Sequence, residues 1–313
     1  MILDAITFVV AFVIAAILYR PFIELLRRLK AGQVIQAELP ESHQKKAGTP
    51  TGGGILFVAL AILGGVLSTF AGHEGALLAT AGLVAGGIIG FADDRSKLQV
   101  GARGIPARFK FPLQVAFASG LTVALMMTGA LHQHWLPAEP LLIVPLTVVA
   151  IVGTANAVNI TDGMDGLAAG LSLIAVAISV LLLPGAPAGE KAVAMTLCGG
   201  VAAFLVFNRY PARVFMGDTG ALAIGFALAM MAVQQGWLLL LPIVCLVFVL
   251  ETLSVMIQVA YFKATGGRRI FKMTPIHYTF HHEGWSENRI ALTFWSVGLV
   301  SALAAVGVAH LAS

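Results

Sequence analysis

Charged side chains are scarce in this chain. Only 11% of its 313 residues are Asp, Glu, Lys or Arg, whereas a soluble domain carries about 25%. Hydrophobic residues make up 58%, and the mean hydropathy is +0.92. This composition excludes a water-soluble globular enzyme, and it equally excludes a disordered chain or a fibrous repeat. We therefore expect an all-α integral membrane protein, with residues 1–313 forming a single polytopic membrane domain.

Cysteine is scarce as well. Cys198 and Cys245 are the only two, and both lie in long apolar runs, so neither a disulfide framework nor a cysteine metal site is expected. The sequence contains no HExxH zinc motif and no Walker A loop. Residues 1–19 have no Lys or Arg ahead of their apolar run and no small-residue cleavage site. We expect them to remain as a first membrane span and not to be removed as a signal peptide.

Ten apolar segments are candidate membrane spans, because a span needs about 20 mostly apolar residues. They lie at 3–19, 52–70, 76–92, 111–130, 141–158, 167–183, 192–207, 220–235, 237–262 and 290–311. Gly86 and Gly90 are four residues apart in the third of them, a spacing that predicts close helix packing.

Basic residues are distributed unevenly over the loops between these segments. With ten alternating spans, one side of the membrane receives the loops 20–51, 93–110, 159–166, 208–219 and 263–289. These loops hold 18 of the 19 Lys and Arg residues, and Lys191 alone falls on the other side. Because basic loops stay in the cytoplasm, we expect this set to face the cytoplasm and both termini to lie outside it.

Acidic residues gather at the ends of the spans on the same side. Asp93 and Asp94 close the third span, and adjacent carboxylates repel each other unless a cation or a shared proton lies between them. A charged helix end is the alternative. Further along, Asn159, Asp162 and Asp165 are spaced by three and would share one face of a helix.

Glycines accompany this second acidic group. Gly163 and Gly166 leave the backbone open to a bulky anionic ligand. The alternative is a polar turn between two spans, but a turn explains one Asp-Gly pair better than two with an upstream Asn.

Three more polar segments belong to the same set of loops. Asp218 lies just before a span, either as an N-cap or beside Arg209 and Arg213 as part of a phosphate site. Residues 263–289 carry several basic side chains and His277 and His281, four apart; the alternative is a basic surface segment that meets lipid headgroups. Residues 42–54 combine a Lys pair with the Gly-rich start of a span, whose backbone N–H groups can hold an anion.

Together these loops bring carboxylates, ammonium groups and histidines to one membrane face. Mg²⁺ prefers one or two carboxylates together with substrate oxygens, and Lys and Arg bind phosphates. The inferred chemistry is phosphoryl transfer at a lipid–water boundary.

The motifs then resemble those of a known family. SHQKKAGTPTGGG, FADDRSK, ARFKFPLQ, NAVNITDGMDGLAAG, FMGDTGALAIG and RRIFKMTPIH with GWSEN occur in order between residues 42 and 288. They are similar to the polyprenyl-phosphate N-acetylhexosamine-1-phosphate transferases, and most similar to those that act on phospho-N-acetylmuramoyl-pentapeptide. The resemblance implies ten spans, outward termini and a cleft on the cytoplasmic face of the bacterial plasma membrane.

The resemblance also implies a reaction and its cofactor. Undecaprenyl phosphate attacks the β-phosphate of UDP-MurNAc-pentapeptide, so that UMP leaves and lipid I is formed, with Mg²⁺ as cofactor. Membrane lipid is an expected partner, nucleic acid is not, and small-residue helix faces permit a homodimer.

Site roles follow from matching motifs. Asp218 and Asp162 match metal-binding positions, and Asp93, Asp94 and Asp218 match catalytic ones, one of the Asp pair being the implied general base. The alternative is an Asp nucleophile; we favour direct attack by the lipid phosphate. Substrate contacts are implied for Lys46, Thr51, Lys97, Lys110, Asn159, Asp162, Asp165, Asn208, Phe215 and His277.

The family's His triplet is altered here to His277-Tyr278-Thr279. We expect His281 or His282 to take over one of its roles from a helical turn later; the alternative is that these roles are dispensable. The change leaves a GlcNAc-1-phosphate or other hexosamine-1-phosphate transferase as an alternative. A transporter is a more remote one, because Glu251 alone lies deep within a span, where ionisable groups are functional by default.

Overall fold

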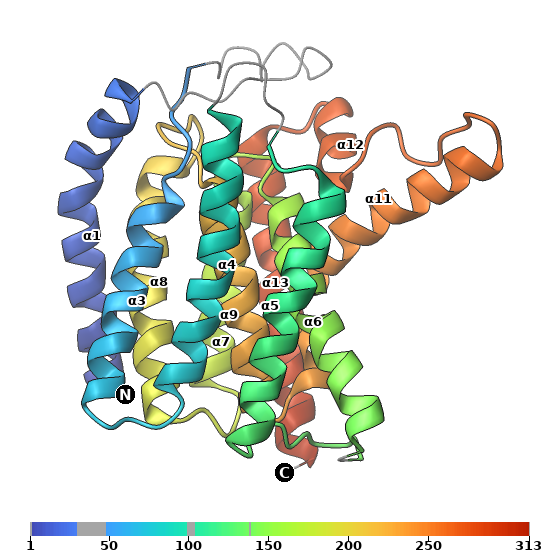
Figure 1. The fold of residues 1–313 in the computed structure, drawn as a ribbon. Helices are drawn as coiled ribbons and strands as arrows, with labels where there is room; N and C mark the ends of the chain where they lie inside the picture. The colour runs from blue at the N-terminus through green and yellow to red at the C-terminus, as the bar shows by residue number, and fades with distance from the viewer. Residues whose placement is uncertain (1, 30–47, 99–103, 138, 313) are drawn as a thin grey trace.

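The computed structural model describes residues 2–29, 48–98, 104–137 and 139–312, and every regular element in these ranges is helical (Figure 1). The elements are α1 (Ile2–Arg28), α3 (Gly54–Phe70), α4 (Ala76–Lys97), α5 (Ala107–Met127), α6 (Pro140–Thr161), α7 (Leu167–Leu181), α8 (Ala188–Asn208), α9 (Gly217–Gln234), η1 (Leu238–Leu240), α10 (Leu241–Val244), α11 (Leu246–Ala264), α12 (Ile276–His282) and α13 (Glu287–Ala312). The prediction of an all-helical membrane protein is confirmed.

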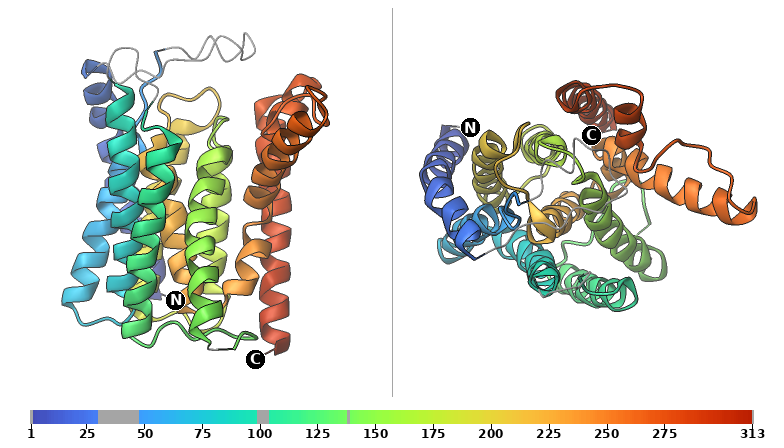
Figure 2. Two further views of the ribbon diagram at one scale, coloured as in Figure 1. Left: turned by 45° about the vertical axis from the view of Figure 1, so that its right-hand side comes forward. Right: turned by 90° about the horizontal axis from the view of Figure 1, so that it is seen from above.

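Each predicted apolar segment falls on a helix or a helical run. Among the described residues, eight helices are long and apolar enough to cross a membrane, and α3 and α7 are shorter apolar helices of 17 and 15 residues. The segment 237–262 is not one helix: η1, α10 and α11 divide it, with the break at Cys245. Beyond this break, α11 leaves the bundle at an angle (Figures 1 and 2).

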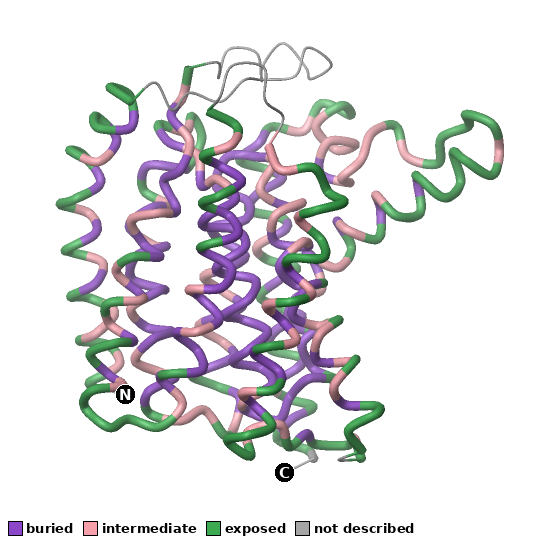
Figure 3. The backbone as a smooth tube through the Cα atoms, viewed as in Figure 1, coloured by how far each residue is buried: buried purple, intermediate pink, exposed green. Residues whose placement is uncertain are grey.

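Helix α9 occupies the centre of the bundle. It packs against α4, α6, α3 and α7, and nearly all of its residues are buried (Figure 3). Its sequence is apolar or small on every side, which is the pattern of a helix enclosed by other helices. Asp218 is therefore carried at one end of the most enclosed element of the protein.

Glycines bring α4 and α9 into close contact. A Cβ atom on Gly90 would lie 2.2 Å from the backbone oxygen of Asp218, and one on Gly86 would lie 2.4 Å from that of Leu222. The close packing predicted from the spacing of these two glycines is confirmed. Because α4 and α9 touch backbone to backbone, the acidic end of α4 is held directly beside the first turn of α9.

The polar connections gather at one end of the bundle. The carboxyl ends of α4 and α8, the first turns of α5 and α9, and α12 lie at the top in Figure 1, while the two chain ends lie at the bottom. These connections belong to the set of loops that holds 18 of the 19 Lys and Arg residues in the sequence.

Candidate active site

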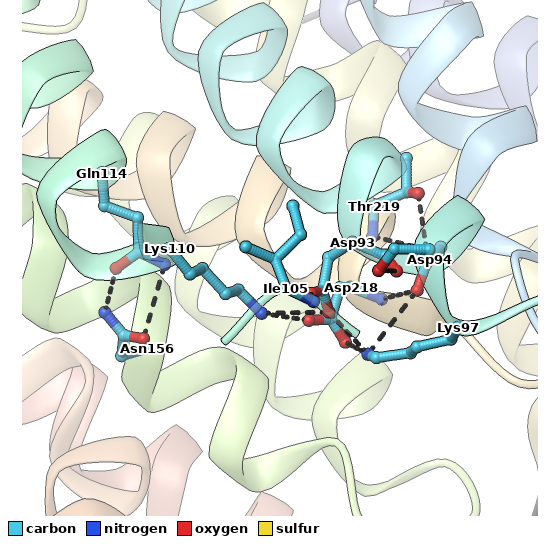
Figure 4. Close-up of polar contacts among 10 residues, drawn as sticks. Asp93, Asp94, Lys97, Ile105, Lys110, Gln114, Asn156, Asp218 and Thr219 are labelled. Atoms are coloured by element: carbon cyan, nitrogen blue, oxygen red, sulfur yellow. Dashed lines mark hydrogen bonds and ion pairs between the residues drawn. The ribbon is translucent and has the colours of Figure 1, made fainter. Parts of the chain in front are cut away.

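Four side chains from three helices form an ionic cluster at the polar end of the bundle (Figure 4). Lys97 Nζ lies 2.8 Å from Asp93 Oδ2 and 2.7 Å from Asp218 Oδ1. Lys110 Nζ lies 3.4 Å from the same Asp93 oxygen and also donates to Asp218 Oδ2. Two ammonium groups thus link α4 and α5 to the start of α9.

The cluster opens on the side of Lys97. The side chain of Asp93 is 3% exposed and those of Asp218 and Lys110 are 13% and 16% exposed, but that of Lys97 is 39% exposed. An incoming anion would therefore meet the ammonium of Lys97 first. The position of Lys97 follows from the sequence, because it lies four residues after Asp93 on the same helix face.

Asp94 Oδ1 lies 4.0 Å from Lys97 Nζ, and its carboxylate binds the start of α9. Its Oδ1 accepts the backbone N–H of Asp218 at 2.9 Å, and its Oδ2 accepts the backbone N–H and the hydroxyl of Thr219 at 2.9 and 2.6 Å. A carboxylate at a helix N-terminus satisfies orphan N–H groups and interacts favourably with the helix dipole. Asp94 therefore fixes the turn that carries Asp218.

Two glycines in the left-handed conformation make room for these contacts. Gly217 has φ of 78°, and a Cβ atom there would lie 2.8 Å from Asp94 Oδ2. Gly104 has φ of 84°, and its Cβ would lie 2.9 Å from Asp93 Oδ1, the atom that accepts the backbone N–H of Ile105 at 2.6 Å. A side chain at either position would be strained and would press on the Asp pair.

Asp162 ends α6 beside the same cluster. Burial raises the pKa of the Asp162 carboxyl well above its usual value, and the charges of Asp218 and Asp94 raise it further, against an opposing effect of Lys97. These mutual effects place Asp162 within electrostatic reach of the ionic cluster. On the other side of α6, Asn156 Nδ2 donates to Gln114 Oε1 at 2.7 Å, which ties α6 to the helix that carries Lys110 (Figure 4).

The loop that follows Asp162 is held from two directions. Asp165 Oδ2 accepts the backbone N–H of Ala212 at 2.9 Å. Asn208 accepts from Gly166 N at 3.0 Å and donates to Val214 O at 2.9 Å. The predicted site residues Asp165 and Asn208 are both buried, and they join the loop 162–166 to the loop 209–216.

His277 and Tyr278 approach the same loop from α12. His277 is fully buried, and its Nε2 would lie 2.8 Å from a Cβ atom on Gly163. The Tyr278 hydroxyl donates to Gly163 O at 2.8 Å. Burial raises the pKa of Tyr278, and the Glu287 and Asp162 carboxylates act in the same direction, so its hydroxyl keeps its proton.

Four of the other predicted residues lie within the described segments. Thr51 and Phe215 are half-buried, and their segments meet where Gly53 N donates to Phe215 O at 2.8 Å. Asn159 is half-buried in the last turn of α6. His281 Nδ1 lies 3.0 Å from Trp285 O, within its own segment. Lys46 lies outside the described residues.

Sequence reasoning missed three residues that contribute to this site. Thr219 binds Asp94, Tyr278 binds Gly163, and Glu287 Oε2 accepts the backbone N–H of Asp165 at 3.3 Å. Thr219 follows Asp218 directly, so its place at a helix start could have flagged it. Tyr278 was marked only as an altered position of the His triplet, and no comparable signal marked Glu287, because its partner lies far away in the sequence.

The donor chemistry fits a divalent cation that arrives with a phosphate. Asp93, Asp94, Asp162 and Asp218 bring up to four negative charges against the two ammonium groups of Lys97 and Lys110, so an anionic substrate needs added positive charge. Within the described ranges, no three His, Cys, Asp or Glu side chains are grouped as a ready metal site. Mg²⁺ does not require one, because it keeps waters and uses one or two carboxylates with substrate oxygens.

Comparison with known proteins identifies the family. The model of glycosyl transferase family 4 matches residues 76–236, the stretch that contains Asp93, Lys110, Asp162 and Asp218. The chain belongs to glycosyl transferase family 4. The resemblance noted from the motifs is thereby confirmed.

Named family relatives match almost the whole chain. The phospho-N-acetylmuramoyl-pentapeptide-transferases of Halalkalibacterium halodurans and Heliobacterium modesticaldum are each 43% identical to it, over 96% of this chain and 95% of their own. The corresponding protein of Listeria monocytogenes is 41% identical, over 96% of both chains.

Proposed function

We propose that this protein transfers phospho-MurNAc-pentapeptide from UDP-MurNAc-pentapeptide to undecaprenyl phosphate in peptidoglycan synthesis. An oxygen of the lipid phosphate attacks the β-phosphorus of the donor, the bond to the UMP oxygen breaks, and lipid I and UMP are formed. The near full-length similarity to pentapeptide transferases supports the substrates. The observation that carries the chemistry is the cluster of Asp93, Lys97, Lys110 and Asp218.

Lys97 and Lys110 are the groups that bind phosphate in this proposal. Asp93 and Asp218 each contact both ammonium groups and hold them beside one another. Such preorganised positive charge stabilises the charge that develops on the transferring phosphoryl group and on UMP. A phosphate monoester is already anionic near neutral pH, so direct attack needs no covalent Asp intermediate.

The two members of the Asp pair have different roles in the proposal. Asp93 faces both lysines, so it is the one placed to act on the reacting phosphates, as general base or by setting the position of the ammonium groups. Asp94 binds three donors at the start of α9 and acts by fixing Asp218. Asp218 and Asp162 would hold Mg²⁺, which when bound neutralises the diphosphate charge.

The acceptor lipid is expected beside α6 and the break before α11. An apolar hollow of about 170 Å³ lies there, lined in part by Val149, Gly153, Leu241, Pro242 and Val249. An isoprenoid chain matches this lining. We further propose ten spans, outward termini and a cytoplasmic site in the bacterial plasma membrane, as the distribution of Lys and Arg predicts.

A donor comparison tests the function. Purified protein in liposomes with undecaprenyl phosphate and Mg²⁺ is given either UDP-MurNAc-pentapeptide or UDP-GlcNAc, and lipid product and UMP are measured. The proposal predicts a lipid-linked product from the first donor only. Product from UDP-GlcNAc alone would make the protein a GlcNAc-1-phosphate transferase. Solute or ion flux without UMP release would support the transporter alternative.

A further inference from the structure

Two ionisable side chains meet at full burial behind the candidate site. Glu251 lies in α11 and His277 in α12, and neither is exposed to solvent. Glu251 Oε2 is 3.1 Å from His277 Nδ1 and 3.5 Å from the His277 backbone nitrogen. One carboxylate oxygen therefore holds both the ring and the backbone of His277 at the start of α12.

The far side of the His277 ring presses on the loop that carries Asp162. Its Nε2 lies 2.8 Å from where a Cβ atom of Gly163 would be, so the backbone of Gly163 and the imidazole are in direct contact. Since Gly163 follows Asp162 directly, Glu251 is connected to the ionic cluster by two steps: Glu251 to His277, and His277 to the loop 162–166.

Stability alone is a poor reason for this pair. Taking two ionisable groups out of water is costly, and apolar residues of similar volume often replace such pairs without loss or with a gain in stability. Among the described residues, Glu251 Oε1 and both ring nitrogens of His277 have no hydrogen-bond partner, which adds to the cost. The 3.1 Å approach of His277 Nδ1 to Glu251 Oε2 is therefore a close contact and not a hydrogen bond. The feature that an apolar pair could not reproduce is the hydrogen bond from the His277 backbone N–H to the carboxylate, beside the 3.1 Å contact of the carboxylate with the ring.

We propose that Glu251 is a positioning residue: it holds His277 against Gly163 and thereby fixes Asp162 relative to Asp218. This inference rests on the proposed phosphoryl transfer. It gives a role to the one carboxylate deep in a predicted span that the reaction itself does not use.

The test compares two substitutions that separate position from stability. Glu251→Gln keeps the shape and one oxygen acceptor, whereas Glu251→Leu keeps the approximate volume and loses the acceptor. Glu190→Leu is the matched control. Glu190 is also fully buried, but it pairs with Gln235 and lies about 27 Å along α8 from Asn208.

The expected result is a change in turnover that does not follow stability. For Glu251→Leu we expect kcat to fall about 10- to 100-fold, the effect of a displacement of about 1 Å in a site. The donor KM should change by less than about twofold, because the lysines that bind phosphate stay in place. Glu251→Gln should keep kcat within about threefold, and Glu190→Leu should keep both parameters unchanged.

Metal binding gives a second measurement that does not depend on activity. Mn²⁺ alone is titrated into each full-length protein and followed by electron paramagnetic resonance. If Asp162 is displaced, Glu251→Leu weakens Mn²⁺ binding and Glu190→Leu does not.

The outcomes distinguish the two proposals. Wild-type protein without transfer activity would overturn the proposed function, whatever the Mn²⁺ titrations show. Active wild type with Glu251→Leu equal to it in kcat and Mn²⁺ affinity would overturn the role of Glu251. The same conclusion follows if the loss of activity in Glu251→Leu only follows its loss of folded protein in thermal unfolding. If Glu251→Leu does not fold, Glu251→Gln is compared with a folded His277→Leu protein. The proposal predicts that Glu251→Gln stays active, because Gln still offers an oxygen acceptor. Equal loss of activity in the two variants would contradict the role of Glu251.

Discussion

Replacing Asp94 by Asn should act mainly through the position of α9. Asp94 accepts three hydrogen bonds from Asp218 and Thr219. Asn keeps one oxygen and turns an NH₂ group toward an N–H donor, so at least one of these bonds is lost. Hydrogen bonds to a charged group contribute about 1.5–3 kcal/mol each. The interaction of an anion with a helix N-terminus contributes about 0.3–2 kcal/mol.

The two contributions together predict a loss of about 2–5 kcal/mol in the local stability of the first turn of α9. This loss should appear as a lower midpoint of thermal unfolding in detergent and, because Asp218 moves with this turn, as a large fall in kcat. Thr219→Val removes only the hydroxyl bond to Asp94 and should lower both quantities by less. Thr219→Ser keeps the hydroxyl and is the matched control.

The contrast with Asp93→Asn makes the reasoning testable. Asp93 meets the two lysines and one backbone N–H, but both lysines also pair with Asp218. Because the lysines keep this partner, Asp93→Asn should reduce turnover with a smaller effect on the unfolding midpoint of the protein. If Asp94→Asn has the unfolding midpoint of the wild type and yet no activity, Asp94 has a chemical role and the positional account is wrong. Near-normal rates in both variants would remove the pair from the mechanism.

Three further predictions follow from the same contacts. Asp218→Ala should abolish turnover and the response to Mg²⁺ while the protein stays folded; activity assays with metal titration and a melting curve check this, and retained activity would rule out the ligand role. Gly90→Ala should prevent normal folding, because its Cβ would lie 2.2 Å from a backbone oxygen. The control Gly120→Ala, whose Cβ meets no atom within 4 Å, should fold and melt like the wild type. Equal melting curves for the two variants would contradict the packing argument. The affinity for the metal should fall about tenfold per pH unit as the pH is lowered below the raised pKa of Asp162, because the metal must displace one proton from that carboxyl. Calorimetric titration at several pH values measures this affinity. An affinity that does not depend on pH would exclude Asp162 as a ligand.

Much of the fold follows from the sequence because membrane helices can be recognised by the length and apolar character of their segments. The contact of Gly86 and Gly90 with α9 was also predictable, since only small residues permit such an approach. The break near Cys245 was not predictable. The segment 237–262 is mostly apolar, and its deepest charged residue, Glu251, lies inside the continuous helix α11.

The sequence predicted which residues form the site better than it predicted what each of them contacts. Asp93, Lys97, Lys110 and Asp218 converge as the motifs indicated. The adjacent Asp94 looked equivalent to Asp93, but neighbouring residues on a helix do not face the same way. Only the close packing of α4 on α9 shows that Asp93 meets both lysines, whereas Asp94 lies 4.0 Å from Lys97 and binds the start of α9.

The most direct test of the account is an experimental structure of the protein with Mn²⁺ in place of Mg²⁺ and an uncleaved analogue of the donor diphosphate. We predict an anomalous peak for Mn²⁺ at about 2.0–2.3 Å from an Asp218 oxygen and from a phosphate oxygen. We also predict that the ammonium groups of Lys97 and Lys110 contact the diphosphate. A metal bound elsewhere, or a diphosphate at the end of the bundle where the chain termini lie, would contradict the central claim.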